Sequence, residues 1–295
     1  MDKKLFYVYL ILLVAFIVIY PILYYKDALV DHLSTTISEN LNAAMINLKA
    51  NIKALHRCSA PNKTNKRTLD PNKAKILFVL DDNWGTQYYF AYQVLKRKGF
   101  PATIAVIPSK VDQPGYMTKA QLTEVYDAGW DLVNHTFHHP KLNTLNEKEQ
   151  EQEILRGTDW LNANCFQRGS KILVYPYGAY NQTTLSILKK HRYHGARSLQ
   201  TGFENNSGYL TYEAKVYNLT TDIETEWVKD WIDQAIEQKK TLIFVNHRFA
   251  YHVTHDPTGM IFDKKKFIEV VDYIDQLRSK VEVITYSEWL DNADH

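Results

Sequence analysis

The chain has 295 residues, of which 45% are hydrophobic and 23% are charged. This is the composition of a globular protein large enough to bury a substantial core. The 35 Lys and Arg residues against 33 Asp and Glu residues give a net charge of +2, which excludes a strongly basic protein that binds nucleic acid through its overall charge.

The first segment, residues 5–25, is an unbroken run of apolar and aromatic side chains without a charge. It is long enough for a membrane helix, which needs about 20 residues. Lys3 and Lys4 precede it and no small-residue cleavage site follows, so we expect residues 1–26 to be an uncleaved transmembrane signal anchor. A cleaved signal peptide is the alternative. The positive-inside rule places the chain after Lys26 outside the cytoplasm.

In residues 27–56, apolar side chains recur at steps of three to four, which predicts an amphipathic helix. We interpret it as a stalk, with packing on the following domain or self-association as alternatives. Residues 57–74 are rich in Lys, Asn and Pro and form a predicted linker. Cys58 and Cys165 are far apart in sequence and give no metal motif. They can pair or stay free in an oxidising exterior, and we favour free thiols.

From residue 75 to residue 293, apolar strand-like runs alternate with helix-like segments. Such alternation predicts an α/β domain with a parallel sheet, and the number of repeats favours a (β/α) barrel of about seven strands over an open sheet. Strands are expected at 75–80, 102–107, 131–134, 171–175, 215–218, 241–246 and 281–285. Helices are expected at 88–98, 118–128, 147–164, 183–191, 224–237 and 263–277.

Polar residues follow several of the expected strands. Asp81 and Asp82 follow the first strand, and His135 follows the third. A Pro-Tyr-Gly turn that contains Tyr177 follows the fourth, and His247 follows the sixth. Because the carboxyl ends of barrel strands converge on one face, these side chains are expected to meet in space.

His135 and His139 are four residues apart, a spacing that can aim two imidazoles at one metal ion. With Asp82 as a third ligand, the set leaves a coordination position open, as in catalytic sites. Asp81 is then placed to act as a base and His247 as an acid, with a backbone N–H near Tyr177 stabilising an oxyanion. These are the parts needed to hydrolyse an amide or an ester with a metal-activated water.

Each signal alone also has a structural interpretation. Adjacent aspartates often cap a turn, and a histidine pair at this spacing arises by chance in a chain with 11 histidines. A single histidine or a Pro-Tyr-Gly turn can serve the core alone. The combination of all of them at strand ends favours a site.

Four motifs together resemble those of the polysaccharide deacetylases, also called the NodB-homology domain or carbohydrate esterase family four. The resemblance covers about residues 75–290 and implies a distorted (β/α) barrel that removes N-acetyl, or sometimes O-acetyl, groups from polysaccharide in a metal-dependent reaction. The motifs are FVLDD at 78–82, HTFHH at 135–139, YPYGAYN at 175–181 and LIFVNHRF at 242–249.

Carried over by position, the resemblance implies the same roles for the site residues. Asp81 resembles the catalytic base and His247 the general acid, and Tyr177 lends its backbone N–H. Asp82, His135 and His139 resemble the metal ligands. The implied metal is usually zinc, although this ligand set also suits cobalt or nickel.

Three positions depart from the family pattern. Asn83 replaces a glycine and is followed by Trp84, and this change is expected to alter the turn beneath Asp81 and narrow the cleft. Val174 stands where an arginine often lies, so the partner that orients Asp81 comes from elsewhere or is missing. Asn246 replaces an apolar residue that would line a pocket for the acetyl methyl group.

The sequence therefore predicts a membrane-anchored, outward-facing, metal-dependent hydrolase that acts on an acetylated polysaccharide of the cell surface or exterior. Two alternatives stay open. One is a non-catalytic glycan-binding module on the same barrel, and the other is an esterase or amidase on small acetylated molecules.

Overall fold

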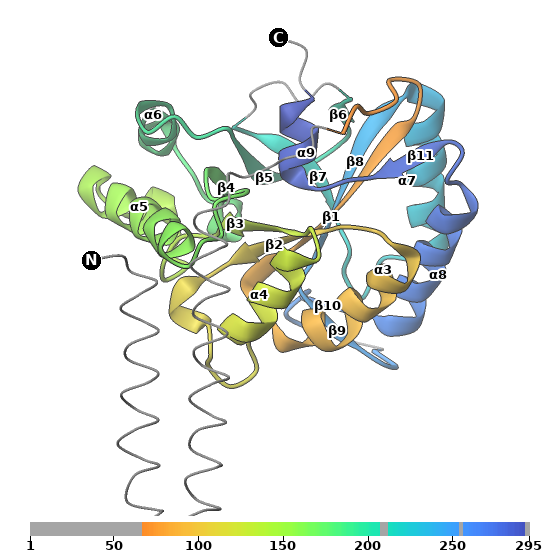
Figure 1. Ribbon diagram of the computed structural model, residues 1–295, viewed down its shortest axis with the longest axis horizontal. Helices are drawn as coiled ribbons and strands as arrows, with labels where there is room; N and C mark the ends of the chain where they lie inside the picture. The colour runs from red at the N-terminus through yellow and green to blue at the C-terminus, as the bar shows by residue number, and fades with distance from the viewer. Residues whose placement is uncertain (1–66, 207–211, 254–255, 293–295) are drawn as a thin grey trace, which may run out of the picture. The chain divides into compact units, whose positions relative to one another are not determined.

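The computed structural model describes residues 67–206, 212–253 and 256–292 (Figure 1). All of them belong to one compact unit, residues 61–295. The predicted anchor at 1–26, the stalk at 27–56 and most of the linker at 57–74 lie outside the described residues and stay predictions. Within the described ranges, no helix combines the length and apolar character needed to cross a membrane.

Seven parallel strands form a closed ring, which confirms the predicted (β/α) barrel. The ring closes where β8 pairs with β1, in register from Lys75 opposite Thr241 to Leu80 opposite Asn246. It is distorted, because β3 and β4 are joined through one residue pair and the register shifts between β5 and β7. In ring order the strands are β1 (Ala74–Leu80), β2 (Thr103–Val106), β3 (Asp131–Asn134), β4 (Ile172–Val174), β5 (Gly195–Thr201), β7 (Ala214–Asn218) and β8 (Lys240–Asn246).

One predicted strand lies outside the ring, and one strand of the ring was not predicted. The segment expected at 281–285 forms β11 (Val281–Val283), which pairs with the first half of β1 outside the ring. The seventh ring strand is instead β5, which the sequence analysis missed. Its sequence, GARSLQT, mixes small and polar residues and therefore lacks the apolar run that marks a buried strand.

Three short strands complete the sheets. β6 (Glu204–Asn205) pairs antiparallel with β8, and β9 (Arg248–Ala250) pairs with β10 (Ile261–Asp263) in a separate two-stranded sheet. That small sheet starts directly after His247, so it fixes the direction in which the chain leaves the barrel.

Helices cover the outside of the ring (Figure 1). All six predicted helices are present, the first as a π-helical turn (Gln87–Tyr92) that continues into α3. The short helix α9 was not predicted. The bounds are α3 (Gln93–Lys98), α4 (Lys119–Asp127), α5 (Glu147–Ala163), α6 (Gln182–Lys190), α7 (Thr225–Gln238), α8 (Lys264–Gln276) and α9 (Tyr286–Asp291).

Local sequence sets where four of these helices begin. Thr118, Asn146, Asn181 and Thr285 each accept a hydrogen bond from the backbone three residues later, and the side chain there bonds back to the cap. Such capping boxes satisfy backbone N–H groups that have no partner within the helix. The helices on the ring therefore start at positions fixed by their own sequence.

Alternation along the strands places polar side chains inside one end of the barrel. Side chains of a strand point alternately to its two faces, and one set forms a buried interior cluster while the other packs under the helices. Asp81, His135 and His247 each come two positions after an interior valine, so they continue the inward-facing rows. The interior cluster includes Leu77, Val79, Ala105, Val133, Ile172, Val174, Ala214, Val216, Ile243 and Val245.

Cys165 follows α5, is 5% exposed, and is disulfide-bonded. This differs from the free thiol that we favoured from sequence spacing. Cys58 lies outside the described residues.

Candidate active site

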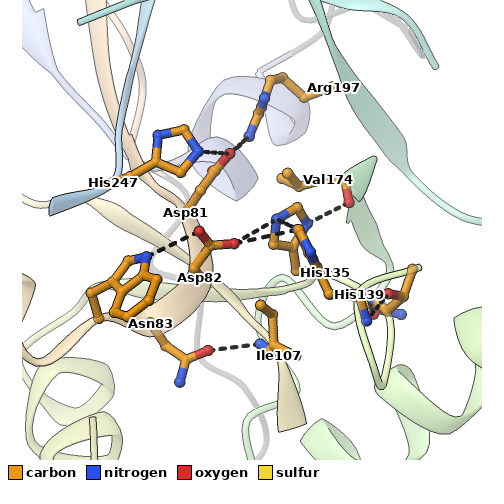
Figure 2. A network of polar contacts seen from close by, with 12 residues as sticks. Asp81, Asp82, Asn83, Ile107, His135, His139, Val174, Arg197 and His247 are labelled. Atoms are coloured by element: carbon orange, nitrogen blue, oxygen red, sulfur yellow. Dashed lines mark hydrogen bonds and ion pairs between the residues drawn. The ribbon is translucent and has the colours of Figure 1, made fainter. Parts of the chain in front are cut away.

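The site begins with a tight turn at the end of β1. Asp81, Asp82 and Asn83 form a single 3-10 turn and are all buried. Asp82 and Asn83 have φ values of 74° and 46°, a left-handed conformation that Asp and Asn tolerate better than most residues. Asn83 Oδ1 accepts a hydrogen bond of 2.8 Å from Ile107 N, so this side chain is turned toward β2 (Figure 2). The expected narrowing of the cleft at this turn stays a prediction.

The two predicted histidine ligands lie on the loop after β3. His135 Nδ1 is 2.7 Å from the carbonyl oxygen of Val174, and because a carbonyl only accepts, Nδ1 carries the proton and Nε2 presents its lone pair. His139 is brought back toward it by a backbone with φ of 67°, and its N–H donates to Thr136 Oγ1 at 3.0 Å. The loop thus turns both Nε2 atoms to the same point.

Asn134 ties this loop to the helix behind it. Its Oδ1 accepts from Thr136 N at 2.8 Å, and its Nδ2 donates to the carbonyl of Ile154 and the hydroxyl of Thr158 in α5. A buried side chain with this many partners has one well-defined position. The loop that carries the histidines is consequently held on a rigid element.

The atoms of Asp82, His135 and His139 face one another with the spacing of metal ligands (Figure 2). Asp82 Oδ1 is 3.3 Å from His135 Nε2 and 3.4 Å from His139 Nε2, and the two nitrogens are 3.1 Å apart. In a tetrahedral site with bonds of about 2.0–2.1 Å, neighbouring ligand atoms lie roughly 3.4 Å apart. The three residues therefore fit a divalent metal ion.

The protonation states agree with this assignment. Burial and the neighbouring His135 lower the pKa of His139 to about 3, so its imidazole is neutral at physiological pH. Burial alone would raise the pKa of Asp82, but the neighbouring His135, His247 and His139 lower it. Asp82 Oδ1 is buried and has no hydrogen-bond partner among the described residues. A carboxylate and two neutral imidazoles are a suitable donor set for a cation.

The second oxygen of Asp82 has a different partner. Its Oδ2 accepts a hydrogen bond of 3.0 Å from the indole Nε1 of Trp84. The Trp84 ring stacks on Tyr116 with ring centres 4.3 Å apart. The contact of Trp84 with Asp82 was not predicted from the sequence.

Asp81 lies beside the metal-ligand set and is paired with an arginine that was not predicted. Arg197 Nη2 donates to Asp81 Oδ1 at 2.6 Å and also to Oδ2. Arg197 is 0% exposed and Asp81 is 3% exposed, and the pair lies in the barrel (Figure 2). The partner of Asp81 thus comes from β5, which answers the question raised by Val174. The role of Arg197 was not predicted, because the segment that forms β5 was not recognised as a strand.

His247 approaches Asp81 from the other side of the carboxylate. Its Nε2 is 3.8 Å from Asp81 Oδ2, and Gln87 Nε2 donates to the backbone carbonyls of both residues, which links the two strand ends. Gln87 is fully buried and was also missed by the sequence analysis.

Asn246 lies in phase with Phe244, which packs in the cluster outside the ring. The Asn246 side chain therefore does not line the barrel interior, and its expected effect on a pocket for the acetyl methyl group does not follow.

Tyr177 lies on the turn after β4, next to the histidines. Its φ is 57°, and its ring is 4.6 Å from that of His139. The turn is closed by hydrogen bonds from Gly178 N to Tyr175 O and from Ala179 N to Pro176 O, neither of which uses the Tyr177 N–H. His138, in contrast, pairs with Glu153 at 2.7 Å and takes no part in the cluster.

Backbone strain is concentrated at these turns. Ten non-glycine residues of the described part have positive φ, and half of them belong to the site. Such conformations persist where surrounding structure enforces them, and they cluster at functional sites. The five are Asp82, Asn83, Thr136, His139 and Tyr177.

The structure therefore brings all six predicted residues to one end of the barrel. It adds Arg197, Trp84 and Gln87 as their partners. Fold and site together define a (β/α)-barrel protein with three residues at metal-ligand spacing, beside a carboxylate and a histidine at the carboxyl ends of its strands.

Comparison with known proteins finds a family match. Residues 68–196 match the family model described as polysaccharide deacetylase, which confirms the resemblance inferred from the motifs.

Among curated proteins, a Bacillus subtilis protein named "Putative polysaccharide deacetylase YxkH" is 30% identical over 149 residues, covering 50% of this chain and 51% of the relative. The poly-beta-1,6-N-acetyl-D-glucosamine N-deacetylase of Staphylococcus epidermidis is 26% identical over 178 residues, or 54% of this chain and 59% of that protein. The chain thus spans between half and three fifths of the length of these relatives.

A solved structure of a "putative polysaccharide deacetylase" from Mycobacterium smegmatis has a TM-score of 0.59 at 12% identity. It covers 76% of this chain and 91% of that one. This similarity supports the fold.

Proposed function

We propose that this protein is a metal-dependent deacetylase that removes N-acetyl groups, or O-acetyl groups, from a polysaccharide. The observation that carries the proposal is the placement of Asp82, His135 and His139 at metal-ligand distances next to the Asp81–Arg197 pair and His247. The match of residues 68–196 to the polysaccharide deacetylase family model supports it.

The residues of the chain divide the reaction between them. Asp82, His135 and His139 would hold the ion, which we propose to be zinc, with cobalt or nickel as substitutes. When bound, such an ion polarises an acetyl carbonyl and lowers the pKa of a water ligand toward ~7. The reaction type is hydrolysis, with acetate and a free amine or hydroxyl as products.

Asp81 acts as the general base in this scheme. It takes a proton from the water that attacks the carbonyl carbon, and Arg197 holds its carboxylate in one orientation. Because Arg197 Nη2 contacts both carboxylate oxygens, the carboxylate has little freedom to rotate away.

His247 acts as the general acid. It lies on the far side of Asp81 from the histidine ligands, with Nε2 directed toward the carboxylate. As the carbon–nitrogen bond breaks, it donates a proton to the leaving nitrogen. The backbone N–H of Tyr177 stabilises the developing oxyanion.

The substrate that we propose is an N-acetylated glycan of the cell surface or exterior. The named activity of the Staphylococcus epidermidis relative supports a polymer of N-acetylglucosamine as the first one to test. The glycan-binding alternative is weakened, because it rested partly on the arginine that is absent at position 174. Arg197 is a partner of Asp81 from another strand.

The test uses the full chain, stripped of metal and reloaded with zinc or cobalt, and measures acetate release from N-acetylglucosamine oligomers. We expect metal-dependent release that Asp81→Asn and His139→Ala abolish, while His138→Ala, a matched control beside the site, retains it. Stoichiometric metal binding without release from N-acetylated or O-acetylated glycans would favour the binding module instead.

We also propose that residues 1–26 anchor the protein in the cell membrane with residues 75–293 outside. The charge-free run at 5–25 and the two lysines before it support this. Cell fractionation and protease treatment of intact cells test it. Recovery of the intact chain in the soluble fraction would refute the anchor.

A further inference from the structure

The two oxygens of the Asp82 carboxylate have different environments. Oδ1 faces the Nε2 atoms of His135 and His139 and has no hydrogen-bond donor among the described residues. Oδ2 accepts the indole N–H of Trp84 at 3.0 Å. The indole N–H therefore competes with a cation for Oδ2, whereas no donor among the described residues competes for Oδ1.

The Trp84 side chain is itself held in place. Its ring lies nearly parallel to that of Tyr116, at an interplanar angle of 21°, and the guanidinium of Arg248 lies 5.1 Å from its centre. The backbones also meet, since Trp84 and Tyr116 form an isolated bridge and Gly85 N donates to Gly115 O at 2.8 Å. The indole N–H thus points at Asp82 from a fixed position.

We propose that Trp84 is a positioning residue that makes Asp82 a one-oxygen ligand of the metal. Carboxylates bind metal ions through one oxygen or through both. By occupying Oδ2, the indole leaves one coordination position more for water and the acetyl oxygen than a two-oxygen aspartate would. This inference rests on the metal centre in the proposed function, and it assigns a role to a residue outside the ligand set.

A packing role for Trp84 can be separated from this role, because packing needs the ring and positioning needs the N–H. Trp84→Phe keeps an aromatic face for Tyr116 and Arg248 and removes the donor. A matched control is Trp227→Phe, since Trp227 lies on α7 and is half exposed.

The experiment measures the metal and not the turnover. Zinc affinity of the full-length protein is determined by competition with a chelator, and the cobalt-loaded protein is examined by visible absorption. For Trp84→Phe we expect zinc affinity to fall by about 10–100-fold, the usual effect of losing a hydrogen-bond partner of a ligand. We also expect weaker cobalt absorption bands, because a freed Oδ2 raises the coordination number and departs from tetrahedral geometry. Trp227→Phe should match the natural chain in both measurements.

Unchanged zinc affinity and an unchanged cobalt spectrum in Trp84→Phe would overturn the inference. Tyr116→Leu provides a second route that leaves the Trp84 donor in place but removes its support, and it should weaken zinc binding in the same direction by a smaller factor. If the natural chain binds no zinc at all, the metal centre of the proposed function fails. If it binds zinc and responds to Trp84→Phe but releases no acetate, the inference stands and the deacetylase assignment fails.

Discussion

Replacing Arg197 by methionine should destabilise the protein because it leaves a carboxylate buried without its partner. Asp81 is 3% exposed and Arg197 is 0% exposed, so water cannot take over the lost interaction. Removing one member of a buried ion pair costs about 3–5 kcal/mol. For a unit of residues 61–295, at roughly 2–4 °C per kcal/mol, this lowers Tm by about 6–20 °C.

The assay is thermal or urea unfolding of the metal-free protein, because a bound cation next to Asp81 would compensate its charge. The charge argument has a second consequence. The double variant Asp81→Asn with Arg197→Met removes both charges and should be more stable than Arg197→Met alone. Arg197→Lys keeps the charge and should fall between the natural chain and Arg197→Met. Additive losses in the double variant, or a Tm change of less than about 2 °C in Arg197→Met, would refute the reasoning.

Three further outcomes are expected. His139→Ala should abolish zinc binding measured by titration calorimetry, whereas His138→Ala should leave it unchanged; equal effects would contradict the ligand assignment. Gly157→Ala should lower the free energy of unfolding by about 1–3 kcal/mol, since a methyl group there would lie 2.2 Å from the buried asparagine oxygen that holds the histidine loop. Burial raises the pKa of Glu282, but its hydrogen bond to Lys75 and the charge of that lysine lower it below its usual value. Its stabilising effect is therefore present at neutral pH and is lost as the pH falls through the lowered pKa. Glu282→Gln should accordingly reduce Tm at neutral pH, and this reduction should shrink as the pH is lowered; a reduction that does not change with pH would exclude a charge effect.

The sequence predicted the site better than the strands. Asp81, His135 and His247 were found because each follows an apolar strand-like run. The alternation of side chains along that strand then directs each of them into the barrel. Arg197 was missed for the opposite reason. It lies within a strand whose small and polar residues resemble a loop, and only the ring closure shows that this segment is buried. Its pairing with Asp81 joins residues 116 positions apart, which no local pattern contains.

The turns could be located from sequence but their conformations could not. Asn83 looked like a loss relative to the glycine of the family, yet its side chain forms a hydrogen bond that a glycine lacks. The neighbouring Trp84 was expected to affect the turn and the cleft, but its hydrogen bond to Asp82 was not predicted. Such roles depend on the direction of a single donor and are fixed only when the surrounding elements are in place.

The pairing of β1 with the end of the chain has a consequence for the order of folding. Lys75 in β1 bonds to Glu282, which is 207 residues later, and β1 also needs β8 to close the ring. Contacts of this sequence separation form late and slowly, because a long loop must be ordered first. During synthesis β1 therefore lacks its pairing with β8 and β11 until nearly all of the domain has been made. Asp82, which follows β1, and His247, which follows β8, therefore come together only when the ring has closed.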